Sequence, residues 1–490
     1  MQETSTAGQR TGDTPFPRLS RLMAIEGGFQ SAMTQLTSDV LLTGFALALG
    51  AGPIHIGMLA TLPLGLRLSQ LFTSTRVARL GRWRTVALLG GAAGRLALFA
   101  GLATAFMDPG DARVWLLLAV VTVSAIGGSL YDLAIVAWMA ELVPLRLRGE
   151  FFGRRNRAIA AIGLVVTLGA ALIIDSLQGQ GDAAVSAFAI VFATGAAIGL
   201  VGLLVLARAP RGPLHHPLDV TPPVHVWMRE AFADRSFYRL ARFGLIWGFA
   251  VNFASPFFAV YQIQVLALPL TAVTLFKTVT TAATMASAGY WGRMVDHFGA
   301  KPVARTGTYL VAVVPLLWLF VIPGRVWPLV LIQLVSGVAF AAYDGNINNL
   351  VLKLASPERR PRYLAAFGAA YGIGSVAAPV VGGAVLWSLE GAAVPAQQAF
   401  FVLFAVGAIL RLLGAAQLRG VQEPGGVSVG RMIRVMGRFR AMTVEIPFEP
   451  FLHYVYLPAA RVADYLAPEP GAPRSRRRST DSDEATKPPT

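Results

Sequence analysis

Twelve mainly apolar stretches fill most of this 490-residue chain, and each is close to the length of a helix that crosses a lipid bilayer. Hydrophobic residues make up 55% of the chain and charged residues only 14%, a balance that a soluble protein of this size does not have. Because backbone groups in lipid must be hydrogen-bonded within the protein, we expect an all-α membrane protein with twelve transmembrane helices. The expected spans are residues 24–50, 53–75, 85–106, 114–143, 157–175, 184–207, 242–264, 268–291, 303–322, 327–352, 362–388 and 398–418.

Basic residues are divided unequally between the connections that join these spans. The even-numbered connections and their borders hold 22 Lys and Arg residues, whereas the odd-numbered connections hold only Arg113 and Arg325. Since short basic loops remain on the inner side, the even connections and both termini are predicted to be cytoplasmic, with the chain in the inner membrane. Topology and lipid headgroups thus account for the net charge of +16, and we expect no nucleic-acid partner.

The two halves of the chain repeat one another. Tyr131-Asp132 and Tyr343-Asp344 stand at the same distance from a later basic turn that contains Arg148 or Arg360. We therefore expect two pseudo-symmetric six-helix bundles of parallel orientation, an arrangement associated with secondary transporters. The expected parts are a cytoplasmic N-terminal tail (1–23), a first bundle (24–207), a cytoplasmic central loop (208–241), a second bundle (242–420), and a basic cytoplasmic tail with an interfacial helix and a disordered end (421–490).

Two loop motifs border the spans. The pattern Gly-x-x-x-Asp-Arg/Lys-x-Gly-x-Arg/Lys follows the eighth span at Gly292, Asp296, Gly299 and Lys301, with His297 at the usually basic position. After the second span the same pattern keeps Arg79, Gly81 and Arg82, but Ser74 and Ala78 replace its first glycine and its aspartate. The pattern Glu-x-x-Pro-x-x-x-Arg-Gly is matched at Glu141, Pro144, Arg148 and Gly149.

Through these motifs the chain resembles the major facilitator superfamily over roughly residues 24–420. The resemblance implies the fold of that superfamily and a central cavity lined by spans one, four, seven and ten. It also implies that the motif residues form gate contacts, which exist in one state of alternating access and break in the other. Asp296 is expected to cap the start of span five or to pair with Arg154 or Arg155. Glu141 is expected to pair with Arg79, Arg82 or Arg148. The alternative is that both motifs only fix tight turns.

Ionisable residues deep in a bilayer cost about 2.5–3.5 kcal/mol each, so their helices must face protein or water there. On this basis, and with the implied cavity helices, the predicted substrate and ion pathway consists of Asp39, Arg95, Tyr131, Asp132, Asn252, Tyr261, Gln262, Lys277, Tyr343, Asp344, Asn346 and Asn348. On span ten, a stripe of small and polar residues is predicted to face water or substrate: Gln333, Gly337, Ala341, Asp344 and Asn348.

Asp132 and Asp344 are the candidates for carrying a proton or for holding a cationic group. Arg95 on the neighbouring span is an alternative explanation for Asp132, because it could simply neutralise that carboxylate. Lys277 could bind an anionic substrate or could be the partner of Asp344.

An enzyme is not expected, because the six histidines are scattered, there is no cysteine, and no nucleotide-binding loop is present. The function predicted is secondary transport of a small organic solute by alternating access, with protons as the candidate coupling ion, no cofactor, and a monomeric chain in the lipid bilayer. The alternative is a protein of the same fold that works as a non-transporting assembly factor or sensor and docks a partner through its C-terminal tail.

Overall fold

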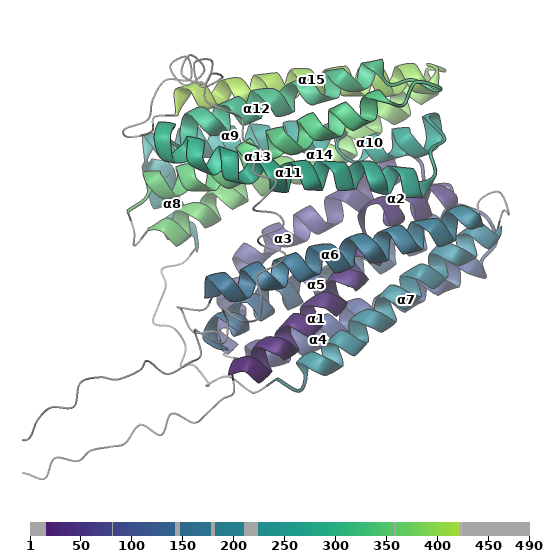
Figure 1. The fold of residues 1–490 in the computed structure, drawn as a ribbon, viewed down its shortest axis with the longest axis horizontal. Helices are drawn as coiled ribbons and strands as arrows, with labels where there is room; N and C mark the ends of the chain where they lie inside the picture. Colours follow the sequence, from purple (N-terminus) through teal and green to yellow (C-terminus); the bar gives the residue numbers. More distant parts are fainter. Residues whose placement is uncertain are drawn as a thin grey trace, which may run out of the picture. The chain divides into compact units, whose positions relative to one another are not determined.

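The computed structural model describes residues 16–80, 82–142, 148–177, 182–209, 224–356, 359–421 and 423, and these residues are almost entirely helical (Figure 1). The first half contains α1 (Phe16–Thr37), α2 (Asp39–Ala48), α3 (Pro53–Leu80), α4 (Trp83–Phe99), η1 (Ala100–Ala105), α5 (Asp111–Leu142), α6 (Arg148–Ser176) and α7 (Asp182–Leu206). The second half contains α8 (Val224–Ala233), α9 (Arg235–Ala254), α10 (Phe257–Val260), η3 (Tyr261–Val265), α11 (Leu270–Phe298), α12 (Ala300–Leu317), η4 (Trp318–Phe320), α13 (Pro328–Leu354), α14 (Arg360–Gly391), α15 (Ala396–Gln417) and η5 (Leu418–Gly420).

Each of the twelve expected spans falls on one of these helices or on a short run of them. Among the described residues, eight helices are long and apolar enough to cross a membrane, and Pro53–Leu66 and Ile162–Ser176 are shorter apolar helices. The two other expected spans lie on α1–α2 and α11, which carry the ionisable residues Glu26, Asp39 and Lys277. The predicted all-α membrane fold is confirmed.

Glycines allow the helices within each half to approach closely. In the first half α5 lies against α4, and a Cβ on Gly94 of α4 would stand 2.8 Å from the carbonyl oxygen of Ser124 on α5. In the second half α14 lies against α9, and Gly374 and Gly382 of α14 meet the carbonyl oxygens of Leu245 and Phe253. Small residues at such contacts are what holds helices together where lipid removes the hydrophobic driving force.

Two spans are interrupted at related positions in the two halves. Helix α1 of the first span ends at Thr37. After Ser38, whose backbone is extended, the span continues as α2, which begins at Asp39 with a φ of +57°. The seventh span ends as α9 at Ala254 and continues through Pro256 and α10 into a π-helical turn, η3. A non-glycine residue at positive φ is uncommon and tends to occur at functional positions.

The two halves meet mainly where α3 packs along α14, and α11 adds contacts with α6 and α2. Thr61 on α3 donates a hydrogen bond of 2.9 Å to the carbonyl oxygen of Val376 on α14. Next to this bond, Gly57 and Gly383 each face the backbone of the opposite helix, at Pro379 and Pro53 respectively. The cavity described below lies beside this contact.

Candidate functional site

A cavity of about 260 Å³ lies between the two halves, at the level of the helix interruptions. Its lining comes from the break in the first span, the break in the seventh span, and proline positions within α3 and α14; among these residues are Ser38, Asp39, Pro63, Asn252, Ser255, Pro256 and Pro379. Irregular backbone at membrane depth is tolerated where it lines a cavity rather than lipid. We call this space the central cavity.

An ion pair joins the halves at the edge of the central cavity. The ammonium group of Lys277 on α11 binds the carboxylate of Asp39, the first residue of α2, and each side chain is about half exposed. The sequence left two roles open for Lys277: binding an anionic substrate and pairing with Asp344. The structure does not show the pairing with Asp344. The partner is Asp39, because α11 contacts α2 across the halves.

Asn252 extends the polar lining onto α14. Its side-chain amide donates to the Oγ of Ser375 at 3.1 Å and to the hydroxyl of Tyr371 at 3.5 Å, besides the carbonyl oxygen of Gly248 on its own helix at 2.9 Å. The amide thus ties α9 to α14 directly beside the cavity.

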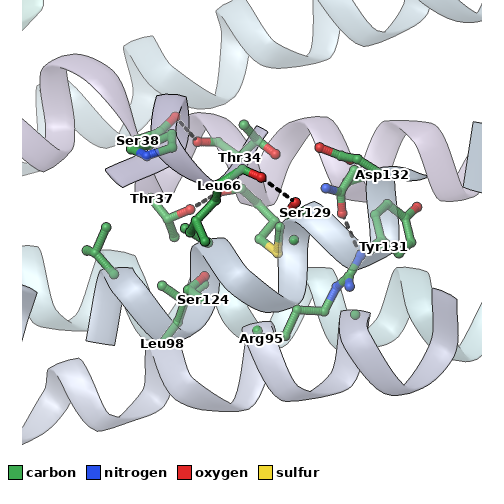
Figure 2. Close-up of a pocket in the computed structure, with 18 of the residues that line it drawn as sticks. Thr34, Thr37, Ser38, Leu66, Arg95, Leu98, Ser124, Ser129, Tyr131 and Asp132 are labelled. Atoms are coloured by element: carbon green, nitrogen blue, oxygen red, sulfur yellow. Dashed lines mark hydrogen bonds between the residues drawn. The ribbon is translucent and has the colours of Figure 1, made fainter. Parts of the chain in front are cut away.

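A second cavity, of about 200 Å³, lies within the first half between α1, α3, α4 and α5 (Figure 2). Its polar lining comprises Gln30, Thr34, Thr37, Ser38, Arg95, Ser124, Ser129 and Asp132. Ser38, Leu42 and Pro63 line both cavities, so the break in the first span stands between them. We call this space the first-half cavity.

Arg95 is the cation of the first-half cavity. Its Nη2 donates to Oε1 of Gln30 at 2.5 Å, and its guanidinium carbon lies 4.6 Å from the ring centre of Tyr131. The hydroxyl of Tyr131 in turn donates to the carboxylate of Glu26, which is fully buried. Arg95 is therefore held by an amide and by an aromatic face whose hydroxyl binds a buried carboxylate. Asp132 lines the same cavity, as Figure 2 shows.

A further contact joins the two halves where α6 ends and α11 begins. The two carboxylate oxygens of Asp175 accept hydrogen bonds of 2.8 Å from the backbone N–H groups of Leu270 and Thr271. A carboxylate at a helix N-terminus satisfies free N–H groups and interacts favourably with the helix dipole. Asp175 of the first half thus caps a helix of the second half, a contact that the sequence did not predict.

Replacing Asp175 by Asn is expected to weaken this contact, because the amide keeps one acceptor oxygen and loses the charge. The cost should be about 1 kcal/mol, or roughly a fivefold shift toward conformations in which these helix ends separate. Distances between spin labels on the ends of α6 and α11 would measure the shift. Asp108→Asn, in the exposed connection before α5, is the matched control; equal distance distributions for the two variants would contradict the contact's role.

The loop motif after α11 is organised by a residue beyond the last span. Gly299 has a φ of +94°, and the carboxylate of Glu423 accepts from the N–H groups of Ala300 at 3.0 Å and Lys301 at 2.8 Å. Glu423 also pairs with the ammonium of Lys353 at 2.8 Å and is almost fully buried. Residue 423 was expected in the tail, so its role was not predicted. The available signal was an acidic residue that follows the last span, on the side where α13 ends with Lys353 in its last turn.

Several residues of the predicted pathway lie in the core and line neither cavity. The hydroxyl of Tyr261 donates to the carbonyl oxygen of Val321 at 2.6 Å, amid aromatic rings of α15 and η4. Tyr343 packs on Trp247 at 5.4 Å between ring centres. Gln262 and Asn346 are buried and donate to backbone carbonyls one turn earlier on their own helices. Each of these four residues lies on a helix face that packs in the core, and the polarity of the side chain alone did not indicate that face.

The polar stripe of α13 is divided between two environments. Gln333 accepts a hydrogen bond from Thr280, and Gly337 packs against the backbone of α11 at Thr280, so this part of the stripe contacts a helix rather than water or substrate. Asp344 and Asn348 are exposed but border neither cavity. In the part of the chain that is described, no hydrogen-bond partner of Asp344 is found.

The side chains of most first-half gate residues and of their expected partners lie outside what the structure describes: Arg79, Gly81, Glu141, Pro144, Arg148, Gly149, Arg154 and Arg155. Arg82 precedes α4 and is exposed, as are Gly292 and Asp296 at the end of α11. The gate roles assigned to both motifs therefore remain predictions.

Comparisons with known proteins agree with the fold. Residues 272–431 match the model of the Major Facilitator Superfamily, whereas no curated protein matches the sequence. A mutant of the nucleoside transporter NupG is 16% identical, with a TM-score of 0.66 over 81% of this chain and 99% of its own. A bacterial homolog of the human lysosomal transporter Spinster is 14% identical, with a TM-score of 0.59 over 84% of this chain and 100% of its own. The xylose transporter XylE from E. coli is 16% identical, with a TM-score of 0.55 over 86% of this chain and 99% of its own. Residues 272–431 therefore carry the sequence pattern of the Major Facilitator Superfamily, and the chain shares the fold of these solved structures.

Proposed function

We propose that the chain is a secondary transporter that moves a small organic solute by alternating access, with proton coupling at the Asp39–Lys277 ion pair. The observation that carries the proposal is this pair, because it joins the two halves at the rim of a cavity between them. A proton taken up by the Asp39 carboxylate removes the negative charge, breaks the pair and leaves Lys277 free to part from α2. Proton binding and separation of the halves are then one event.

The two cavities supply the solute site in this proposal. Hydroxyl and amide groups from α1 and α5 surround Arg95 and Asp132 in the first-half cavity, and Asn252 with its partners adds donors from the second half. Such a set of opposite charges and neutral donors suits a solute that carries several hydrogen-bonding groups, with Asp132 the acceptor for any cationic group. Nucleosides and sugars, which the names NupG and XylE indicate for those proteins, have this chemistry.

For the topology we keep the orientation that the basic loops predict, with both termini cytoplasmic in the inner membrane. In this orientation the Asp175 contact lies at the outer end and Glu423 at the inner end of the molecule. Alternating access then requires the Asp175 contact, the Asp39–Lys277 pair and the α3–α14 seam to open together toward the outside.

Proteoliposomes would test the proposal. Purified protein is reconstituted, and uptake of labelled nucleosides, monosaccharides and dipeptides is measured with and without an inward proton gradient, while a trapped pH dye reports proton entry. We expect one solute class to drive proton entry and to accumulate only with the gradient. Because the chain has no cysteine, spin-label pairs can be placed freely on the two halves. One unchanging distance between the halves under all conditions would contradict alternating access.

The alternative function, a docking role for the tail, is separated by a truncation that ends the chain after Glu423. The truncation point matters, because Glu423 caps α12 and its loss would disturb the bundle itself. A transporter is expected to keep its flux in the truncated form. Absence of flux in both the full-length and the truncated form, with a partner that only the full-length form retains, would favour the docking role.

A further inference from the structure

An apolar groove lies on the outer surface of the second half, away from both polar cavities. It has a volume of about 350 Å³ and is lined only by apolar residues of α9, α14 and α15: Leu245, Ile246, Phe249, Ala250, Ile373, Gly374, Ala377, Leu410 and Leu413. A volume of this size is in the range of ligand pockets. Its rim is open, since Ile373 is 54% and Leu413 57% exposed.

The groove has a structural cause. Gly374 lies so close to the carbonyl of Leu245 that α9 and α14 touch along their backbones, and the next small residue on the open side is Ala377. These two positions leave a floor without bulky side chains, while leucines and isoleucine form the walls. In a bilayer such a surface contacts acyl chains rather than water.

The groove ends at a basic group on the side where α9 begins. Arg242 lies three and four residues before Leu245 and Ile246, on the same face of α9, and its Nη2 donates to Oε1 of Gln417 at 2.9 Å. Gln417 lies four residues after Leu413, on the same face of α15. Both walls of the groove therefore lead to the same polar end.

A second arginine and a tyrosine lie near the same end of the groove. Arg239, one turn before Arg242, donates to the carbonyl oxygen of Gly420 at 3.0 Å, and Tyr238 beside it is half exposed, as aromatic side chains are at a membrane interface. Among the described residues, both arginines have only uncharged acceptors, because the ion pairs found there belong to Lys277 and Lys353. Within the described residues, these two cations thus lie near one end of the groove without a carboxylate partner.

We propose that this groove binds one acyl chain of an anionic phospholipid, whose phosphate headgroup lies on Arg239 and Arg242. Charge complementarity selects the occupant: an apolar slot that ends in two guanidinium groups, which bind only uncharged acceptors among the described residues, matches a molecule with an apolar chain and an anionic head. The site is separate from the transport cavities and does not depend on the proposed transport function.

Native mass spectrometry of the full-length protein in detergent tests the headgroup. The protein is titrated with phosphatidylglycerol or with phosphatidylcholine carrying the same acyl chains. We expect tighter binding of phosphatidylglycerol, and about a fivefold loss for each arginine removed, so that R239Q/R242Q binds it about 25-fold more weakly. R325Q, on an exposed residue in the connection between η4 and α13, is the matched control and should bind as the original protein does. Equal binding of the two lipids, or undiminished phosphatidylglycerol binding by R239Q/R242Q, would overturn the proposal.

The acyl-chain part is tested separately by filling the groove. Ala377→Phe places a ring in the slot, and Ile373→Trp covers it from an exposed position, so a folding defect in one variant leaves the other as the test. Both should lose phosphatidylglycerol binding at least tenfold while the arginines remain. Binding that survives both substitutions would overturn the groove as the site. A loss with these variants but none with R239Q/R242Q would indicate an uncharged apolar occupant and would also overturn the proposal.

Discussion

Replacing Asp39 by Asn or Lys277 by Gln is expected to abolish gradient-driven transport, with a drop of about tenfold to 100-fold in initial rate. Each single change leaves the other residue as a lone charge at the cavity between the halves. A lone charge at the middle of a bilayer costs about 2.5–3.5 kcal/mol, and water in the cavity lowers that cost without removing it. The measurement is the initial rate of solute uptake into proteoliposomes under a proton gradient.

The double variant D39N/K277Q separates a structural role from a coupling role. It has no lone charge, so the amount of folded protein should return to that of the original chain, because removing both partners of a pair is far cheaper than removing one. Exchange of solute across the membrane should continue, but it should no longer respond to the proton gradient. Full gradient-driven accumulation by the double variant would show that the pair does not couple protons to transport.

Replacing Gly57 by Leu is expected to stop transport by preventing the halves from closing along α3 and α14. A Cβ at this position would stand 3.0 Å from the Cα of Val380 and nearer still to the carbonyl oxygen of Pro379. Overpacking of this kind costs about 1–3 kcal/mol, which is about a 5- to 150-fold shift in a conformational equilibrium. Spin-label distances between α3 and α14 should lengthen, and the rate of transport should fall by a similar factor.

The chain offers a matched control for this substitution. Gly169, in the middle of α6, has open space where its Cβ would lie, so Gly169→Leu should leave both the distances and the rate unchanged. If Gly57→Leu behaved as Gly169→Leu does, the α3–α14 contact would not be a seam that closes during the transport cycle.

The fold could be predicted because it depends on features that a linear sequence displays. Apolar length locates the spans, and the structure places a helix on every expected span. The orientation that the basic loops indicate stays a prediction. The interruptions were less visible. Pro256 indicates one of them, but neither Ser38 nor Asp39 is a proline or a glycine, although the φ of Asp39 is +57°.

The interaction partners of the ionisable side chains could not be predicted to the same extent. Lys277 was recognised as a deep charge, yet its partner depends on which helices cross between the halves. Glu26 and Arg411 are fully or almost fully buried and lie inside the first and last expected spans. The rule that ionisable residues within a span must face protein or water identified Lys277 and applied to these two residues as well, but they were not considered. Tyr261 and Tyr343 were included because they are polar, although an amphipathic ring serves equally well in a core when its hydroxyl or its edge finds a partner.

Arg411 has a consequence for how the second half moves. Its guanidinium on α15 donates to the carbonyl oxygens of Val251 on α9, at 2.9 Å, and of Val311 on α12, at 3.3 Å. Sliding one of these helices past another would strip a buried cation of its hydrogen bonds, a penalty of several kcal/mol. Helices α9, α12 and α15 therefore move as a single rigid body, and the flexibility that a working cycle demands must reside elsewhere, in α11, in the interrupted first span and in the part of the seventh span that follows α9.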